Sequence, residues 1–217
     1  MNGGAVAYWS ANATLISCTF INNTVNGHGA GVDWWGANGK LTGSIFIGNT
    51  ANGNGGGVYW TGSRGTLTDS TFTDNTANGN GGGLYWLGNN GTLTSSNFNY
   101  NTANNGGGVY WQGANGNLND STFSGNTASE NGGAVYWYVA GSMNNCAFIN
   151  SKWINSYSKT NGIYARTNLN IKDGKGIVDI NTQGILSGIS IVVLNNETYY
   201  YPPNSNINFV NNVLNYA

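Results

Sequence analysis

The chain has 217 residues, enough for one domain of ordinary size with its own hydrophobic core. Only 7% of the residues are charged, the formal net charge is −1, and glycine fills 35 positions. Nucleic acids and anionic membranes are bound through clustered lysine and arginine, so this composition excludes a basic binding surface. We expect no nucleic-acid partner. Because the longest apolar run, residues 189–194, is too short to cross a bilayer, we also expect no direct membrane insertion.

One valine-centred segment recurs along the chain at an almost constant interval. Its central residue returns after 26, 26, 26, 25 and 26 residues, at Val6, Val32, Val58, Leu84, Val109 and Val135. A second column holds Leu15, Leu41, Leu67, Leu93, Leu118 and Met143, and a third holds Phe20, Phe46, Phe72, Phe98, Phe123 and Phe148. This self-similarity predicts one supersecondary unit stacked on copies of itself around a continuous apolar core.

Each repeat contains two segments that are typical of strands, such as Gly56–Trp60 and Thr66–Phe72, between turns rich in glycine and asparagine. No segment has the 3.6-residue apolar rhythm of a helix. The pattern predicts an all-β fold, a right-handed parallel β-helix of about six to seven coils of 25–26 residues with a C-terminal β cap or module start. We expect a repeat domain over residues 1–160, and a degenerate coil with a cap or linker over residues 161–217.

Alternation along the strands assigns side chains to the two faces of each coil. With a bend between Leu67 and Phe72, both of these positions face the core. In the first segment Trp60 and Tyr59 point to opposite sides, and the column of Tyr59 includes Asp33. An unpaired buried carboxylate is costly, so we expect the tyrosine column outside. The opposite column then lies inside: Tyr8, Trp34, Trp60, Trp86, Trp111 and Trp137.

Two polar columns are interpreted as structural. An asparagine that recurs at one turn of each coil can hydrogen-bond to its copies above and below: Asn23, Asn49, Asn75, Asn101 and Asn126. Cys18 and Cys146 share an inward column with serines, five coils apart, roughly 24 Å at strand spacing. They cannot form a disulfide and are interpreted as small buried fillers.

The acidic residues give little support for an enzymatic function. Asp69 and Asp120 share one outward column, with Ser95 between them, roughly 10 Å apart, which exceeds the usual separation of a catalytic carboxylate pair. His28 lies in a glycine-rich turn and is interpreted as a solvated turn residue. We expect no catalytic residue, no cofactor and no metal site. A β-helix that binds or cleaves polysaccharides remains the alternative.

Aromatic side chains provide better material for binding. If the tyrosine column points outward, its rings and their neighbours two residues further on form an exposed surface, which usually marks an interaction site. The predicted ligand-binding residues are Trp9, Trp35, Tyr59, Tyr85, Tyr110, Tyr136 and Tyr138. Flat rings at the strand spacing could stack on sugars or on a partner chain. An alternative of equal weight is that the tyrosines have no binding role and serve only to stabilise the sheet, through contacts with one another.

Outward threonines suggest a third class of function, binding to ice. The array is formed by Thr14, Thr42, Thr66, Thr68, Thr92 and Thr94. It is interrupted in neighbouring coils by residues such as Ile16 and Lys40. An ordered lattice would need a less broken column, so ice binding is a minor alternative.

The repeated Gly-Gly-Ala/Gly-Val-Tyr followed by Phe-x-x-Asn-Thr-Ala, over residues 3 to about 151, resembles the repeats of chlamydial polymorphic outer membrane proteins. It is even more similar to adhesin-like surface proteins of methanogenic archaea, as is the segment 193–203. The resemblance implies large modular exported proteins whose β-helix stalks mediate attachment. We therefore expect a fragment of a larger extracellular, cell-surface adhesin without catalytic activity, with a protein or glycan on a host or neighbouring cell as its partner.

Overall fold

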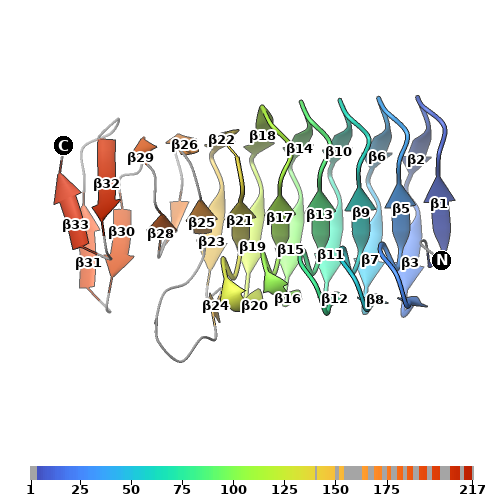
Figure 1. The fold of residues 1–217 in the computed structure, drawn as a ribbon, viewed down its shortest axis with the longest axis horizontal. Coiled ribbons are helices and arrows are strands. Elements are labelled where there is room, and N and C mark those ends of the chain that lie inside the picture. Colours follow the sequence, from blue (N-terminus) through green and yellow to red (C-terminus); the bar gives the residue numbers. More distant parts are fainter. Residues whose placement is uncertain are drawn as a thin grey trace.

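The computed structural model describes residues 4–139 and 141–149 without further gaps, and the strands that follow from Lys152 onward; side chains are described over residues 4–139 and 141–146. The chain winds as a right-handed parallel β-helix whose coils lie side by side along the long axis (Figure 1). Among the described residues there is no helix that is long and apolar enough to cross a membrane.

Strands at equivalent positions of successive coils pair into four long sheets. The first sheet, in order, contains β1 (Val6–Tyr8), β5 (Val32–Trp34), β9 (Val58–Trp60), β13 (Leu84–Trp86), β17 (Val109–Trp111), β21 (Val135–Trp137), β25 (Ile163–Ala165) and β28 (Ile180–Thr182). The second contains β2 (Thr14–Ile16), β6 (Lys40–Thr42), β10 (Thr66–Thr68), β14 (Thr92–Thr94), β18 (Gly116–Asn119), β22 (Gly141–Asn144), β26 (Leu169–Lys172), β29 (Ile185–Ser187), β32 (Asn206–Val210) and β33 (Val213–Tyr216).

The remaining strands complete the wall of each coil. The third sheet contains β3 (Thr19–Ile21), β7 (Ile45–Ile47), β11 (Thr71–Thr73), β15 (Asn97–Asn99), β19 (Thr122–Ser124), β23 (Ala147–Ile149) and β27 (Lys175–Gly176). The fourth contains β4 (Thr24–Val25), β8 (Thr50–Ala51), β12 (Thr76–Ala77), β16 (Thr102–Asn105), β20 (Thr127–Asn131) and β24 (Lys152–Trp153). A separate hairpin is formed by β30 (Ile191–Leu194) and β31 (Glu197–Tyr200).

A regular coil has four strands, where the sequence predicted two, because the second predicted segment is broken at a corner and a further short strand, such as β12, follows it. Asp69 separates β10 from β11 with a left-handed φ of 52°, and Asp74 separates β11 from β12 with a φ of 55°. Left-handed residues recur at the same corner in the neighbouring coils: Ser17, Gly43, Asp69, Ser95, Asp120 and Asn145. Each such residue turns the chain sharply and ends a strand of three or four residues.

Beyond residue 149 the parallel pairing continues and then changes. β25 and β26, which fall in the expected degenerate coil, pair parallel with β21 and β22. β32 pairs antiparallel with both β29 and β33, and β30 with β31. The expected domain division at residue 160 lies outside the described residues and stays a prediction.

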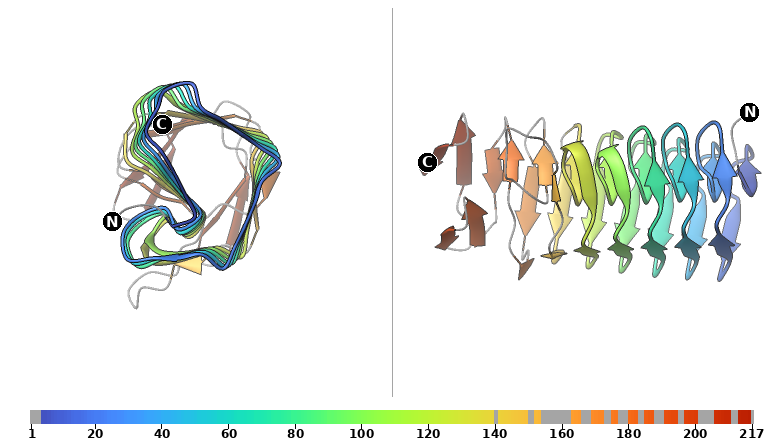
Figure 2. Two further views of the ribbon diagram at one scale, coloured as in Figure 1. Left: turned by 90° about the vertical axis from the view of Figure 1, so that its right-hand side faces the viewer. Right: turned by 90° about the horizontal axis from the view of Figure 1, so that it is seen from below.

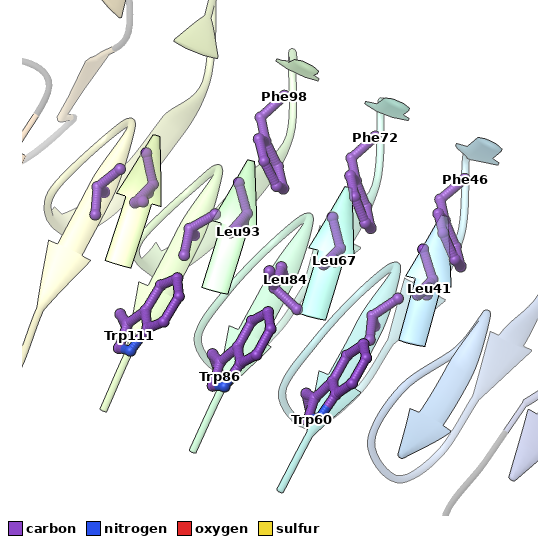
Figure 3. Packing of buried hydrophobic residues seen from close by; sticks show 14 of the residues in the cluster. Leu41, Phe46, Trp60, Leu67, Phe72, Leu84, Trp86, Leu93, Phe98 and Trp111 are labelled. Atoms are coloured by element: carbon purple, nitrogen blue, oxygen red, sulfur yellow. The ribbon is translucent and has the colours of Figure 1, made fainter. Parts of the chain in front are cut away.

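The core is a set of parallel rows, one for each apolar column of the sequence (Figure 3). The tryptophan column lies inside, as predicted, and Trp34, Trp60, Trp86, Trp111 and Trp137 are all 0% exposed. Successive indoles stack nearly parallel, with ring centroids 4.5, 4.8, 4.7 and 4.9 Å apart. The bulky column therefore fits because each ring stacks on its copy in the next coil.

The predicted asparagine ladder is present and is fully buried from Asn49 to Asn126. Asn75 donates from Nδ2 to Asn101 Oδ1 at 2.9 Å and to the Phe46 carbonyl oxygen at 3.0 Å. Its Oδ1 accepts from the backbone N–H of Asn49 at 3.0 Å and from Asn49 Nδ2 at 2.9 Å. One side chain thus satisfies polar groups of three coils at a turn that is closed to water.

The serine column that contains the two cysteines does more than fill space. Ser70 Oγ donates to the Thr68 carbonyl oxygen at 2.8 Å and accepts from the backbone N–H of Ser44 at 3.1 Å, and this pattern repeats along the column. Cys18 and Cys146 are both free thiols, as expected from their separation. Cys146 is fully buried, whereas Cys18 is partly exposed.

Candidate functional site

The tyrosine column forms a stack on the side of the first sheet that is opposite to the main core. Its members come from the centres of β9, β13, β17 and β21: Tyr59, Tyr85, Tyr110 and Tyr136. Their ring centroids lie 5.1, 4.9 and 4.6 Å apart in chain order. The four side chains are only 7–9% exposed, so the expectation of an open outward ladder is wrong. Neighbouring rings cover the flat faces on which sugars were expected to stack.

The physical reason for this burial is visible along the axis of the β-helix. The segment that joins the fourth strand of one coil to the first strand of the next bulges into a small second lobe (Figure 2). This lobe lies beside the outer side of the first sheet, and His28, which belongs to it, contacts the ring of Tyr59. Both faces of a strand such as β9 are therefore covered.

The side chains of Tyr59 and Tyr85 are shielded from solvent, which affects their phenol groups. Tyr85 donates from its hydroxyl to Gln112 Oε1 in the next coil at 2.6 Å. Burial, followed by the neighbouring Tyr59 and Tyr138, raises the pKa of Tyr85 from 10.0 to about 12. Burial and the nearby Asp33 also raise the pKa of Tyr59. These phenols stay protonated at neutral pH and can act as hydrogen-bond donors.

Two tryptophans flank the stack and are open to solvent. Trp9 and Trp35 stack on each other with centroids 4.9 Å apart and planes 7° apart, and they are 67% and 37% exposed. The ring centroids of Trp35 and Tyr59 lie 6.3 Å apart, with an interplanar angle of 56°. At the other end, Tyr138 packs against the tyrosines and is partly buried.

The structure thus joins all seven predicted residues into one continuous band along the first sheet. We call it the aromatic band: Trp9, Trp35, Tyr59, Tyr85, Tyr110, Tyr136 and Tyr138. Its members differ in access, because the tyrosines of the stack are buried and the tryptophans are exposed. Whether the band binds a ligand stays a prediction.

Asp33 occupies the tyrosine column one coil before the stack begins. It pairs in register with Ala7 on one side and Tyr59 on the other. We expected solvent around this carboxylate, but Asp33 is 0% exposed, and neither of its oxygens has a partner at well-formed hydrogen-bonding geometry. Burial raises the pKa of Asp33, while weak hydrogen bonding from the Trp35 side chain and the electrostatic influence of His28 lower it by less.

His28 is not the solvated turn residue that the sequence suggested. Its Nδ1 accepts a hydrogen bond from the backbone N–H of Asn54 at 2.8 Å. Its ring stacks on Tyr59 with centroids 4.6 Å apart and planes 17° apart. His28 therefore continues the stack where the column has Asp33 in place of a tyrosine. The sequence carried one signal for this, the interruption of the column at Asp33.

No catalytic or metal-binding arrangement is seen in the described part of the chain. Asp69 and Asp120 are exposed at equivalent corners, with Ser95 between them, and Asp120 Oδ1 accepts from Asn145 Nδ2 at 2.8 Å. The described residues contain no group of three or more histidine, cysteine, aspartate or glutamate side chains that could hold a metal ion. The absence of enzymatic activity stays a prediction.

Comparison with known proteins shows that part of the repeat is similar to one family. Two segments, residues 69–85 and 120–136, match the family described as the Chlamydia polymorphic membrane protein repeat. Each match runs from the corner at Asp69 or Asp120, through β11 or β19, to the first strand of the next coil. The comparison supports the predicted relationship to chlamydial repeats. No curated protein and no solved structure matched the chain.

Proposed function

We propose that this chain is a non-catalytic section of a cell-surface adhesin, with the β-helix as a stalk and the aromatic band as its contact surface. The matched repeat and the β-helix fold support a role at a cell surface. The finer assignment, to extracellular adhesin-like proteins of methanogenic archaea, is supported by the sequence resemblance alone. The proposed partner is a glycan or protein on a host or neighbouring cell.

The exposed pair of Trp9 and Trp35 is the observation that carries this proposal. Tryptophan is enriched among the residues that dominate binding energy, and contiguous exposed aromatic surface usually marks a contact site. Because the faces of the stacked tyrosines are covered, the tryptophans would supply most of the contact area. The tyrosines would then hold the band rigid. A polysaccharide-cleaving enzyme would need converging carboxylates, and the described acids at Asp69 and Asp120 do not converge.

A double substitution tests the proposal. We expect Trp9→Ala with Trp35→Ala to reduce binding at least about tenfold, the effect of losing one binding hot spot. Binding would be measured on a glycan array and, for protein partners, by flow cytometry with whole archaeal and bacterial cells. Thermal unfolding would show that the variant remains folded.

A matched control removes apolar area from another face of the same two coils. Ile21 and Ile47 are 52% and 36% exposed and lie side by side on β3 and β7. Ile21→Ala with Ile47→Ala should leave binding unchanged. The proposal is wrong if the native protein binds neither glycans nor cells, or if both double variants bind as the native protein does.

A further inference from the structure

Four copies of a modification motif lie among the described side chains. The motif is Asn-x-Ser/Thr, the acceptor of N-linked glycans on surface segments of exported proteins, and its asparagines are Asn12, Asn22, Asn90 and Asn119. A fifth copy, at Asn196, lies outside the described residues. Because the chain is rich in asparagine, copies also arise by chance. Exposure and hydrogen bonding therefore decide which of them an enzyme can reach.

Three of the four copies share one geometry. Asn12, Asn22 and Asn90 are exposed and have left-handed φ values of 62°, 54° and 56°. In each case the threonine two residues later is the first residue of the next strand: Thr14 of β2, Thr24 of β4 and Thr92 of β14. These threonines are exposed or partly exposed, and none of their hydroxyl groups is hydrogen-bonded to another described residue. Each motif therefore presents both its amide and its hydroxyl group at a corner of a coil.

The amide nitrogen that would receive the glycan is free in Asn12 and Asn90. Asn12 Oδ1 accepts from Asn38 Nδ2 at 3.1 Å, and Asn90 Oδ1 accepts from Asn115 Nδ2 at 3.1 Å. The Nδ2 atoms of Asn12 and Asn90 donate no hydrogen bond within the described part of the chain, whereas those of Asn38 and Asn115 are occupied. Asn38 and Asn115 also lack a serine or threonine two positions later. In this column the motif thus coincides with the unoccupied amide nitrogens.

Asn22 occupies another corner, between β3 and β4. In the next coil the same corner holds Gly48, and a Cβ atom there would lie 2.4 Å from Asn22 Oδ1. The Asn22 side chain therefore lies against a residue that has no side chain of its own. Its amide group forms no hydrogen bond with the other described residues, so it is open to an enzyme as well.

The fourth copy has a different geometry. Asn119 is the last residue of β18 and is only partly exposed, and the hydroxyl residue of its motif, Ser121, is 1% exposed. Ser121 Oγ donates to the Asn119 carbonyl oxygen at 2.7 Å and accepts from the backbone N–H of Ser96 at 3.2 Å. Because glycan transfer requires the hydroxyl residue of the motif as well as the amide, this copy is closed in the folded chain.

We infer that Asn12, Asn22 and Asn90 carry N-linked glycans and that Asn119 does not. The donor is an oligosaccharide that is joined to a lipid through phosphate. The asparagine Nδ2 forms a bond to the anomeric carbon of the sugar and releases one proton, while the bond from that carbon to the phosphate oxygen breaks and the lipid phosphate leaves with the electron pair. The inference rests on the proposed function only because the chain must be exported to meet this donor.

Glycosylation of the folded full chain in vitro tests the inference. An oligosaccharyltransferase specific for Asn-x-Ser/Thr and a lipid-linked oligosaccharide are added, and the digested product is mapped by mass spectrometry. We expect the mass of the glycan on the peptides that contain Asn12, Asn22 and Asn90, and its absence from the peptide that contains Asn119. Absence of the glycan from all three predicted sites, or equal glycosylation of Asn119, would overturn the inference.

A peptide of residues 115–125 contains the motif of Asn119 without the fold. Its glycosylation should exceed that of Asn119 in the folded chain at least about tenfold, because in the folded chain Ser121 is reached only after local unfolding. Equal glycosylation of the peptide and the folded chain at this motif would contradict the role of burial.

Two substitutions at one exposed threonine separate the motif from general exposure. Thr14→Ala should abolish glycosylation of Asn12, and Thr14→Ser should retain it, while both variants keep the glycans at Asn22 and Asn90. A glycan that persists on Asn12 in Thr14→Ala would overturn the assignment. Binding to glycans and cells is measured on the unmodified chain, so failure of glycosylation is distinguished from failure of the adhesin proposal.

Discussion

Trp60 and Gly65 are mutually dependent, because the indole occupies the space that a side chain at residue 65 would need. A Cβ atom placed on Gly65 would lie 2.6 Å from both Nε1 and Cε2 of Trp60. The same relationship recurs in five coils, between Trp34 and Gly39, Trp60 and Gly65, Trp86 and Gly91, Trp111 and Gly116, and Trp137 and Gly141. The tryptophan column therefore requires the glycine column.

Gly65→Ala should destabilise the protein by about 1–3 kcal/mol, the usual effect of overpacking a close-packed core. The free energy of unfolding would be measured in urea. Ser63→Ala in the same turn is the control and should change stability by about 0.5 kcal/mol or less. In a Trp60→Phe background the smaller ring relieves the clash, so a double-mutant cycle should give a favourable coupling. Additive effects would contradict this explanation.

Asn75→Ala should be more damaging than its size suggests. The substitution leaves the Phe46 carbonyl oxygen and the backbone N–H of Asn49 without their partners in a turn closed to water. At roughly 1–3 kcal/mol for each buried group, we expect a loss of about 2–6 kcal/mol in urea unfolding. Asn78→Ala is the matched control, since Asn78 Nδ2 donates to Asn52 Oδ1 on the exposed surface at 3.1 Å. A similar loss in both variants would show that burial is not the cause.

Stability should fall as the pH rises from about 9 to 12. Burial raises the pKa of Cys146 from 9.0 to about 12, and that of Tyr85 from 10.0 to about 12. The folded state holds both protons more tightly than the unfolded state, so this contribution is complete below pH 9 and is lost as the pH rises to 12. Thermal unfolding across this range would measure it. Cys146→Ser with Tyr85→Phe should flatten the curve, and an unchanged slope would contradict the assignment.

Asp33→Asn should make the protein more stable at pH 7. Burial raises the pKa of Asp33 above its ordinary value of 3.8, so the folded state favours the protonated carboxyl group. This preference stabilises the folded state fully below the ordinary pKa, and the stabilisation is lost as the pH rises through the raised pKa. The melting temperature of the variant should therefore exceed that of the native protein at pH 7, and the difference should shrink towards pH 4. A less stable variant at pH 7 would show that the charge is compensated.

The sequence was sufficient to predict which columns form the core. Leu67, Phe72 and Trp60 recur at a constant period, and alternation within each strand places them on one side. Corners were harder to predict, because residue type does not reveal every left-handed position. Arg64 and Tyr100 have φ values of 56° and 54°, which their side chains do not favour. Only their places in columns of asparagine, aspartate and glycine could have identified them.

The solvent exposure of the aromatic band could be predicted only in part. Alternation correctly separated Tyr59 from Trp60, but it could not reveal what lies beyond the outer side of the strand. The lobe that contains His28 depends on how a glycine-rich segment of the coil folds back at left-handed glycines such as Gly29, and the alternation of apolar residues does not reveal that path. The exposure of Trp35 and the burial of Asp33 follow from this path. The proximity of the Trp35 side chain to Asp33 could not be inferred from spacing alone.

The direction of the backbone hydrogen bonds has a mechanical consequence. They join one coil to the next, as from the Thr61 N–H to the Trp34 carbonyl oxygen at 2.7 Å, and therefore run along the long axis. Tension between the two ends loads the junctions in series, so the weakest junction sets the rupture force of the whole rod. A load applied across the flank is shared among several coils in parallel. Attachment through the flank of the β-helix should therefore resist a larger force than attachment through its end.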